Sequence, residues 1–153
     1  TFLADEAATV DVGGKIGAAL IAGNVVFLEG ELGAGKTTFT RGVLRARGHT
    51  GAVKSPTYTL CEPYESDDTH LVCHLDLYRL SDPEELEFLG FRDYLGSGAI
   101  VLIEWPSRGE GWLPNPDLKI ELSERGSGRA LRVLALTTHG SQVLERCGVD
   151  HVE

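Results

Sequence analysis

Residues 30–38, with the sequence GELGAGKTT, match the pattern G-x-x-x-x-G-K-[ST] of a phosphate-binding P-loop. The preceding residues, 24–29, are rich in β-branched and aromatic side chains and predict a short buried strand. The following residues, 38–47, place Phe39 and Val43 at helical spacing. A strand, a glycine-rich loop and a helix are the context that this motif requires. An ordinary glycine turn would explain the glycines but not the Lys-Thr pair in register.

This motif has a direct chemical meaning. Glycines allow several backbone N–H groups to turn toward one point, and the N-terminus of the following helix adds partial positive charge there. Lys36 would supply a full charge to the β-phosphate of ATP or ADP and to the γ-phosphate of ATP, and the Thr37 hydroxyl would bind Mg²⁺. The residues expected to contact the nucleotide are Glu31, Leu32, Gly33, Ala34, Gly35, Lys36, Thr37 and Thr38.

The order of the remaining patterns predicts one α/β domain over residues 1–153, similar to a P-loop NTPase, with a mainly parallel sheet flanked by helices. Residues 99–104 are the most apolar run and predict a central strand buried on both faces. The other predicted strands are 24–29, 59–64, 70–76, 118–122 and 131–136, the last two forming an antiparallel hairpin at the C-terminal edge through a turn at 126–128. The predicted helices are 5–20, 38–47, one that begins at 81–85 and continues through 91–95, and 141–147, with a Gly/Pro-rich loop at 108–116.

Two acids follow apolar strands, Asp76 and Glu104. Both are expected at the carboxyl edge of the sheet, where the P-loop also lies and where α/β proteins bind ligands. A P-loop protein needs an acid there to hold Mg²⁺ and to orient the attacking water. Either acid alone is equally well explained as a solvated strand end, but two together favour a catalytic and metal role for at least one. The sequence leaves open which acid orients water.

The segment Ser55-Pro56-Thr57 allows two interpretations. Ser-Pro favours an extended or turn geometry, so the pattern alone indicates a plain loop into the next strand. The alternative is a segment whose hydroxyls lie near the phosphates and which changes shape with them.

Three other residues are weaker candidates. Arg79 is placed to reach phosphate, or equally to pair with Glu84 or Glu85. His74 lies inside a predicted strand, where a packed, hydrogen-bonded histidine is commoner than a catalytic one. Trp105 either covers the nucleotide or fills the core, and the core is the usual position.

Composition narrows the range of partners. The chain has 153 residues and a formal net charge of −9, which argues against a whole surface built for nucleic acid or an anionic membrane. No apolar run approaches membrane-spanning length. Three cysteines without a C-x-x-C pair or zinc spacing are typical of a reducing cytoplasm. The one basic concentration, either a solvated face or a contact for a partner or RNA, comprises Arg41, Arg45, Arg47, His49 and Lys54.

Taken in order, five blocks of sequence carry a resemblance to a known family. The blocks are GELGAGKTT at 30–38, VKSPTYTL at 53–60, HLDLYRL at 74–80, PEELEF at 83–88 and IEWP at 103–106. The ordered set resembles the TsaE family, bacterial ATPases of tRNA threonylcarbamoyladenosine synthesis, over roughly residues 5–137. Residues after Thr138 carry none of this signature.

This resemblance implies a slow, Mg²⁺-dependent ATPase in which Lys36 and Thr37 bind nucleotide and metal, and Asp76 and Glu104 are the metal and hydrolysis acids. It implies that the TsaD–TsaB protein pair is the partner and that tRNA is contacted mainly through that pair. It favours the switch interpretation of the 55–57 segment. The residues expected to act in switching or in partner contact are Ser55, Pro56, Thr57, Tyr78, Arg79 and Trp105.

Two other functional classes stay open at this point. A small-molecule kinase would need an Arg-bearing lid and an acceptor pocket, and neither is clear in the sequence. A nucleotide-gated binding module would need occupancy alone, without hydrolysis. A GTPase is disfavoured because the guanine motif N-K-x-D is absent.

Overall fold

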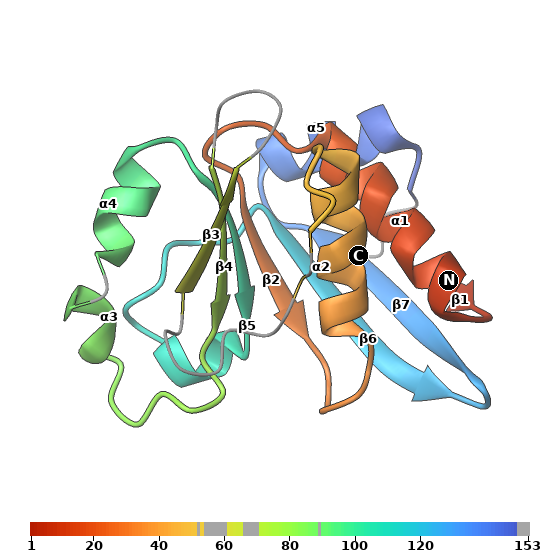
Figure 1. Ribbon diagram of the computed structural model, residues 1–153, viewed down its shortest axis with the longest axis horizontal. Helices are drawn as coiled ribbons and strands as arrows, with labels where there is room; N and C mark the ends of the chain where they lie inside the picture. The colour runs from red at the N-terminus through yellow and green to blue at the C-terminus, as the bar shows by residue number, and fades with distance from the viewer. Residues whose placement is uncertain (52, 54–60, 66–70, 89, 150–153) are drawn as a thin grey trace.

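The computed structural model describes residues 1–51, 53, 61–65, 71–88 and 90–149 of the 153-residue chain. The elements follow in the order β1 (Phe2–Leu3), α1 (Glu6–Ala19), β2 (Val25–Glu29), α2 (Lys36–Ala46), β3 (Cys61–Glu65), β4 (Leu71–Asp76), α3 (Glu85–Phe88), α4 (Phe91–Gly96), β5 (Ile100–Glu104), the 3₁₀ helix η1 (Pro106–Gly109), β6 (Leu118–Arg125), β7 (Gly128–Ala135) and α5 (Thr138–Cys147). Figure 1 shows their arrangement.

The described strands form one sheet in the order β1-β7-β6-β2-β5-β4-β3. The four central strands, β6, β2, β5 and β4, run parallel, while β3, β7 and β1 are antiparallel to their neighbours. The predicted mainly parallel sheet and its C-terminal hairpin are therefore confirmed. The structure adds the two-residue strand β1, which was not predicted and which pairs with the outer side of β7.

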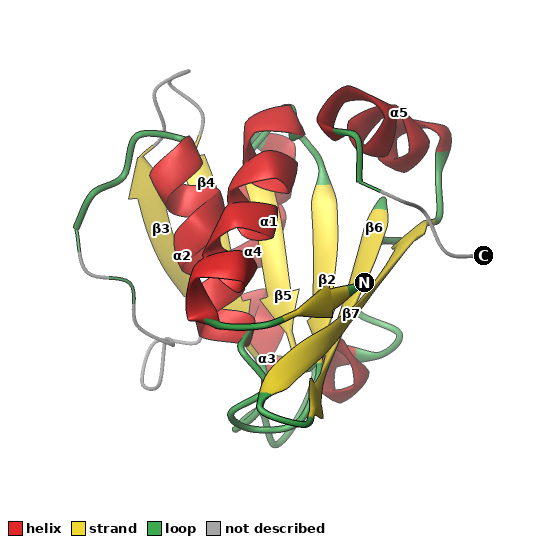
Figure 2. Cartoon of the chain, turned by 90° about the vertical axis from the view of Figure 1, so that its right-hand side faces the viewer, coloured by secondary structure: helices red, strands yellow, loops and turns green. Residues whose placement is uncertain are grey.

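Helices cover both faces of this sheet, as Figures 1 and 2 show. Helices α1, α2 and α5 enclose one buried core with the sheet, and α3 and α4 enclose a second core on the other face. Strand β5 serves both, because Ile100 and Leu102 belong to the first core and Val101 and Ile103 to the second. This double burial confirms the expectation for residues 99–104.

Helices α1 and α2 cross closely because small residues meet at the crossing. A Cβ atom added to Gly13 would collide with the carbonyl oxygen of Phe39, and one added to Gly42 would collide with that of Val10. The glycines of α1 weaken its helical propensity. They are compatible with the helix because tertiary packing, together with the side chain of Asp5 accepting from Ala8 N at 2.9 Å at its N-terminus, stabilises it.

Element boundaries differ from the predictions in several places. The helix expected from 81–85 through 91–95 is two helices, because Gly90 adopts φ 69° and starts α4 anew. The hairpin strands are longer than predicted, and α5 begins at Thr138, where the Thr137 side chain accepts from Gly140 N. The loop expected from 108 begins with the helical turn η1. Among the described helices, none has the length and apolar composition needed to span a membrane.

Candidate functional site

Three neighbouring parallel strands end at the same edge of the sheet. The register pairs Leu28 of β2 with Glu104 of β5, and Glu104 with Asp76 of β4. The loop at 30–35 leaves β2 at this edge and returns as α2, which begins at Lys36. Strand direction and register therefore bring the two predicted acids beside the P-loop.

A pocket of about 220 Å³ lies at this edge. Its lining residues are Leu32, Gly33, Gly35, Lys36, Thr37, Thr38, Asp76, Glu104 and Trp105. Two of the residues expected to contact nucleotide, Glu31 and Ala34, are not among them. The Glu31 side chain is exposed and the Ala34 side chain is buried. The pocket thus combines loop, helix N-terminus and both strand-end acids.

Lys36 is held inside this pocket by neutral oxygens. Its Nζ donates to the carbonyl oxygens of Gly30 and of Glu31, the latter at 3.3 Å, and lies 4.2 Å from the ring centroid of Trp105. Burial lowers the pKa of Lys36 below its usual 10.5, and the carboxylates of Glu104, Asp76 and Glu31 act in the opposite direction. The ammonium is therefore a desolvated charge without a carboxylate in direct contact among the described ion pairs.

Glu104 is oriented by a histidine from the neighbouring strand. Its Oε2 lies 2.5 Å from Nε2 of His74, and both side chains are almost fully buried. The second ring nitrogen, Nδ1, is buried and has no hydrogen-bond partner in the described part of the chain. The expectation of a packed, hydrogen-bonded histidine at position 74 is confirmed, but its partner is the candidate catalytic acid.

Asp76 is less buried than Glu104. Its Oδ1 accepts from the backbone N of Tyr78 at 3.0 Å. Burial raises the pKa of Asp76 above its usual 3.8, and the nearby Glu104 carboxylate adds to that effect. The Tyr78 hydrogen bond and the charges of His74 and Lys36 act against the shift. The two acids and Lys36 thus form one electrostatic unit.

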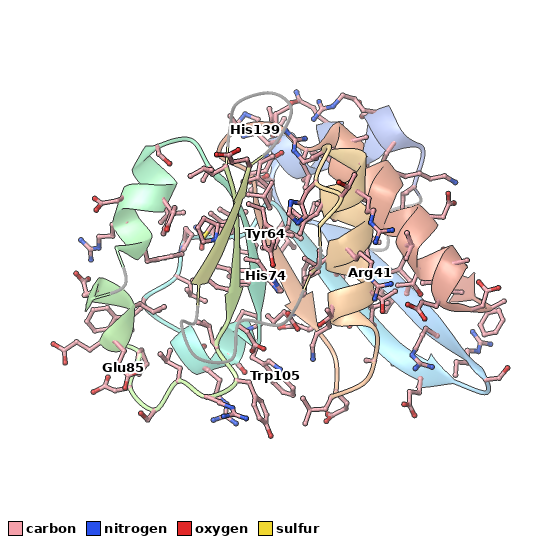
Figure 3. All side chains as sticks on the ribbon, in the orientation of Figure 1. Arg41, Tyr64, His74, Glu85, Trp105 and His139 are labelled. Atoms are coloured by element: carbon pink, nitrogen blue, oxygen red, sulfur yellow. The ribbon has the colours of Figure 1, made fainter. Side chains whose placement is uncertain are left out.

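Trp105 covers one side of the pocket. Its backbone is left-handed, with φ 57°, at the start of η1. Its ring lies 5.0 Å from that of Tyr78, and the Arg108 guanidinium carbon lies 5.6 Å from the Tyr78 ring centroid. Figure 3 shows Trp105 beyond the end of β5, away from His74 in the interior. Trp105 therefore packs against the second core and also lines the pocket, so the core interpretation is confirmed, and covering of a nucleotide stays a prediction.

A second pocket, of about 180 Å³, lies on the other side of the loop. It is lined by Asp5, Glu6, Thr9, Gly33, Gly35, Thr38, Ser127, Gly128 and Arg129. The hairpin residues in this set were not predicted. No local signal marks them, because they meet the P-loop only through the pairing of β6 with β2.

The other candidates lie elsewhere. Ser55, Pro56 and Thr57 fall outside the described residues. Arg79 is exposed and is not among the described residues that line the first pocket. The basic concentration is partly structural, since Arg47 is buried and donates to Gly17 O and Leu20 O, each at 3.0 Å.

Comparison with known proteins agrees with this architecture. The family described as threonylcarbamoyl adenosine biosynthesis protein TsaE matches residues 3–131. The TsaE proteins of Haemophilus influenzae and Bacillus subtilis are 48% and 38% identical over 120 and 125 residues, covering 78% and 82% of this chain and 75% and 76% of theirs. The crystal structure of Bacillus subtilis YdiB superposes with a TM-score of 0.80 at 29% identity, covering 97% of this chain and 92% of that one. The chain therefore belongs to the TsaE family of threonylcarbamoyl adenosine biosynthesis proteins.

Proposed function

We propose that the protein is a cytoplasmic, Mg²⁺-dependent ATPase that couples its nucleotide cycle to the tRNA threonylcarbamoyladenosine modification machinery. One observation carries the proposal: Lys36, the N-terminus of α2 and two strand-end carboxylates line a single pocket. Family membership supports the biosynthetic role. The pocket supports the chemistry, because it brings phosphate-binding groups and acids to one place.

The two pockets indicate how a nucleotide would lie. They share Gly33, Gly35 and Thr38, so they flank the N-terminus of α2 from opposite sides. The first amides of a helix have no partner within it and attract phosphate. The phosphates would face Lys36 in the first pocket, and the nucleoside would extend toward Thr9 and the hairpin in the second.

The donor set fits Mg²⁺. Thr37, Asp76 and Glu104 contribute one hydroxyl and two carboxylates to the same pocket. These hard oxygen ligands suit Mg²⁺, which prefers to be held by few protein groups together with substrate phosphates. When bound, the ion would neutralise charge that develops on the transferred phosphoryl group.

The protein's own groups have distinct tasks in this proposal. Lys36 exchanges the carbonyl oxygens of Gly30 and Glu31 for phosphate oxygens, and its burial strengthens that attraction. Glu104 accepts a hydrogen bond from the attacking water, while the contact with His74 fixes the orientation of its carboxyl group. Trp105 shields the lysine side of the pocket from solvent.

Phosphate release tests the reaction class. We expect purified protein with ATP and Mg²⁺ to release inorganic phosphate slowly and to form no phosphorylated small molecule. Transfer to an added acceptor would instead indicate a kinase. Binding of ADP and ATP without any phosphate release, also with partners present in a single-turnover experiment, would indicate a nucleotide-gated binding module.

The proposed partner is the TsaD–TsaB complex, with tRNA contacted mainly through it. The rim of the nucleotide pocket carries exposed apolar surface, with Leu32 64% and Tyr78 37% accessible. Such surface at a nucleotide site suits a partner that senses nucleotide state. Calorimetric titration into TsaD–TsaB with an ATP analogue, with ADP and without nucleotide tests the coupling, which must be reciprocal. Equal affinity in all three states would contradict it.

A further inference from the structure

We propose that Arg129 is a positioning residue that holds the P-loop in its phosphate-binding shape. The inference rests on the proposed nucleotide function but concerns a residue outside every motif in the chain. Arg129 lies on β7, far along the sequence from the loop. Its guanidinium nevertheless donates from Nε to Ala34 O and from Nη2 to Gly33 O, both at 3.1 Å.

Strand pairing and a backbone hydrogen bond position the Arg129 side chain for this contact. Strand β7 lies between β1 and β6, and Arg129 pairs with Leu3 on one side and Glu124 on the other. Nη1 donates to Gly128 O at 2.9 Å, which fixes the direction of the side chain. A Cβ at position 128 would collide with Leu3 O, so glycine permits β1 to approach here. The guanidinium is thus placed by three strands.

The two carbonyl contacts determine where the loop amides point. In a planar trans peptide, the carbonyl oxygen and the next N–H point in opposite directions. Because Ala34 O is directed at Arg129, the N–H of Gly35 is directed away from Arg129. The N–H of Ala34 is used within the loop, donating to Glu31 O at 3.1 Å. Arg129 therefore orients the amide that immediately precedes the N-terminus of α2.

The guanidinium is suited to this task in a way that an ammonium is not. Arginine presents several N–H donors in a rigid plane, so one side chain can hold neighbouring carbonyls at fixed angles. A lysine offers one point charge on a flexible stem. Arg132, three residues further along β7, provides a natural contrast, since it is exposed and pairs with Glu121 at 3.4 Å.

Arg129→Met and Arg129→Lys test the proposal, with Arg132→Met as the matched control on the same strand. We expect ADP and ATP affinity to fall by about 10- to 100-fold in Arg129→Met, as for loss of charge-assisted hydrogen bonds. Lysine should restore little of it. The KM for ATP should rise while kcat at saturating ATP stays within about threefold, because a binding conformation is lost rather than a reacting group. Arg132→Met should bind nucleotide like the wild type.

A second measurement does not depend on nucleotide. Backbone ¹⁵N order parameters of Gly33, Ala34 and Gly35 in the ligand-free protein should fall in both Arg129 variants and stay unchanged in Arg132→Met. The positioning role would be overturned if the loop in the Arg129 variants kept the order parameters of the wild type, or if Arg129→Met bound nucleotide with the affinity of the wild type. If the wild type bound no nucleotide, the proposed function would fail, while the order parameters would still decide whether Arg129 holds the loop.

Discussion

The two ends of the parallel sheet surround their charged groups differently. At the carboxyl end, Lys36, Asp76 and Glu104 share one pocket, and burial shifts the pKa of Lys36 downward and that of Asp76 upward. At the amino end, Asp117 precedes β6 and is surrounded by donors from its own chain. Both ends place acids beside strands, but we expect the carboxyl end to bind the ligand, because a lysine and two acids meet in one pocket there.

At the amino end, both carboxylate oxygens of Asp117 accept hydrogen bonds. Asp117 Oδ2 accepts from Val25 N at 2.9 Å and from Asn24 Nδ2 at 3.4 Å, and its Oδ1 accepts from Thr137 Oγ1 at 2.7 Å. These bonds tie the start of β2 to the start of α5. These bonds provide both oxygens of the Asp117 carboxylate with donors, which gives this residue a structural role. The two ends therefore differ in the hydrogen-bond partners that their charged groups have, rather than in residue type.

Glu104→Gln gives the sharpest test of the carboxyl end. The amide is similar in shape but is a poor acceptor for the water proton, so kcat for ATP hydrolysis should fall by about 10²- to 10⁴-fold. ADP affinity should stay within about threefold because the phosphate contacts are retained. Phosphate-release kinetics and calorimetry measure the two effects. Glu121→Gln is the control, because Glu121 lies on β6 in a solvent-accessible ion pair with Arg132. An unchanged kcat in Glu104→Gln would show that Glu104 has no role in the mechanism.

Lys36→Ala should separate binding from folding. In the wild type, ADP at a hundred times its Kd should add about 2.7 kcal/mol to the free energy of unfolding. We expect most of this gain to be absent in Lys36→Ala, while the ligand-free variant unfolds at a similar or higher temperature because a buried ammonium has been removed. Thermal denaturation with and without ADP measures both. An equal ADP-induced shift in the two proteins would contradict the phosphate role of Lys36.

Asp117→Ala should lower the stability of the ligand-free protein and leave its response to ADP unchanged, the reverse of Lys36→Ala. Removing the carboxylate leaves the partly buried donors of Val25 and Thr137 without their partner, which should cost about 1 kcal/mol of stability or more. The added stability from ADP should be unchanged, because the proposed nucleotide pocket lies at the opposite end of the sheet. Urea unfolding with and without ADP tests this. A loss of ADP response would show that the two ends are coupled.

Much of this architecture was predictable because it is encoded locally. The run at 30–38, the strand before it and the helix after it are contiguous, and the direction of parallel strands was enough to place Asp76 and Glu104 at one edge. Strand β1 was not predictable, since Phe2 and Leu3 are too few to show periodicity.

The missed parts of the site depend on register between distant segments. The His74–Glu104 contact requires β4 and β5 to be neighbours, and the reach of Arg129 to Ala34 spans 95 positions. Neither relation has a signature in a single sequence. The separation of α3 from α4 follows from Gly90 adopting φ 69°, which a pattern of apolar residues does not reveal.

Asp76→Asn should give the smallest change of those predicted here, a change in the melting temperature of the ligand-free protein. The sign of this change is informative. Burial raises the pKa of Asp76 in the folded protein, so above that pKa the folded state must carry a charge that the unfolded chain carries more easily. The Asp76 side chain contributes its full stabilisation of the folded state below pH 3.8, the usual pKa of an aspartate. That stabilisation is lost as the pH rises through the raised pKa of Asp76 in the folded protein. Asparagine keeps an oxygen to accept from Tyr78 N and carries no charge, so it avoids that loss.

We therefore expect the ligand-free Asp76→Asn protein to melt at a higher temperature than the wild type at pH 7. The difference should shrink toward zero as pH falls toward 3.8, the usual pKa of an aspartate. Asp11→Asn, at an exposed ion pair with Lys15, should change little at either pH. Calorimetric scans of the three proteins across this range decide the matter. A less stable Asp76→Asn at pH 7 would mean that attraction to Lys36 outweighs burial, and that the carboxyl end resembles the amino end in being held together by its own groups.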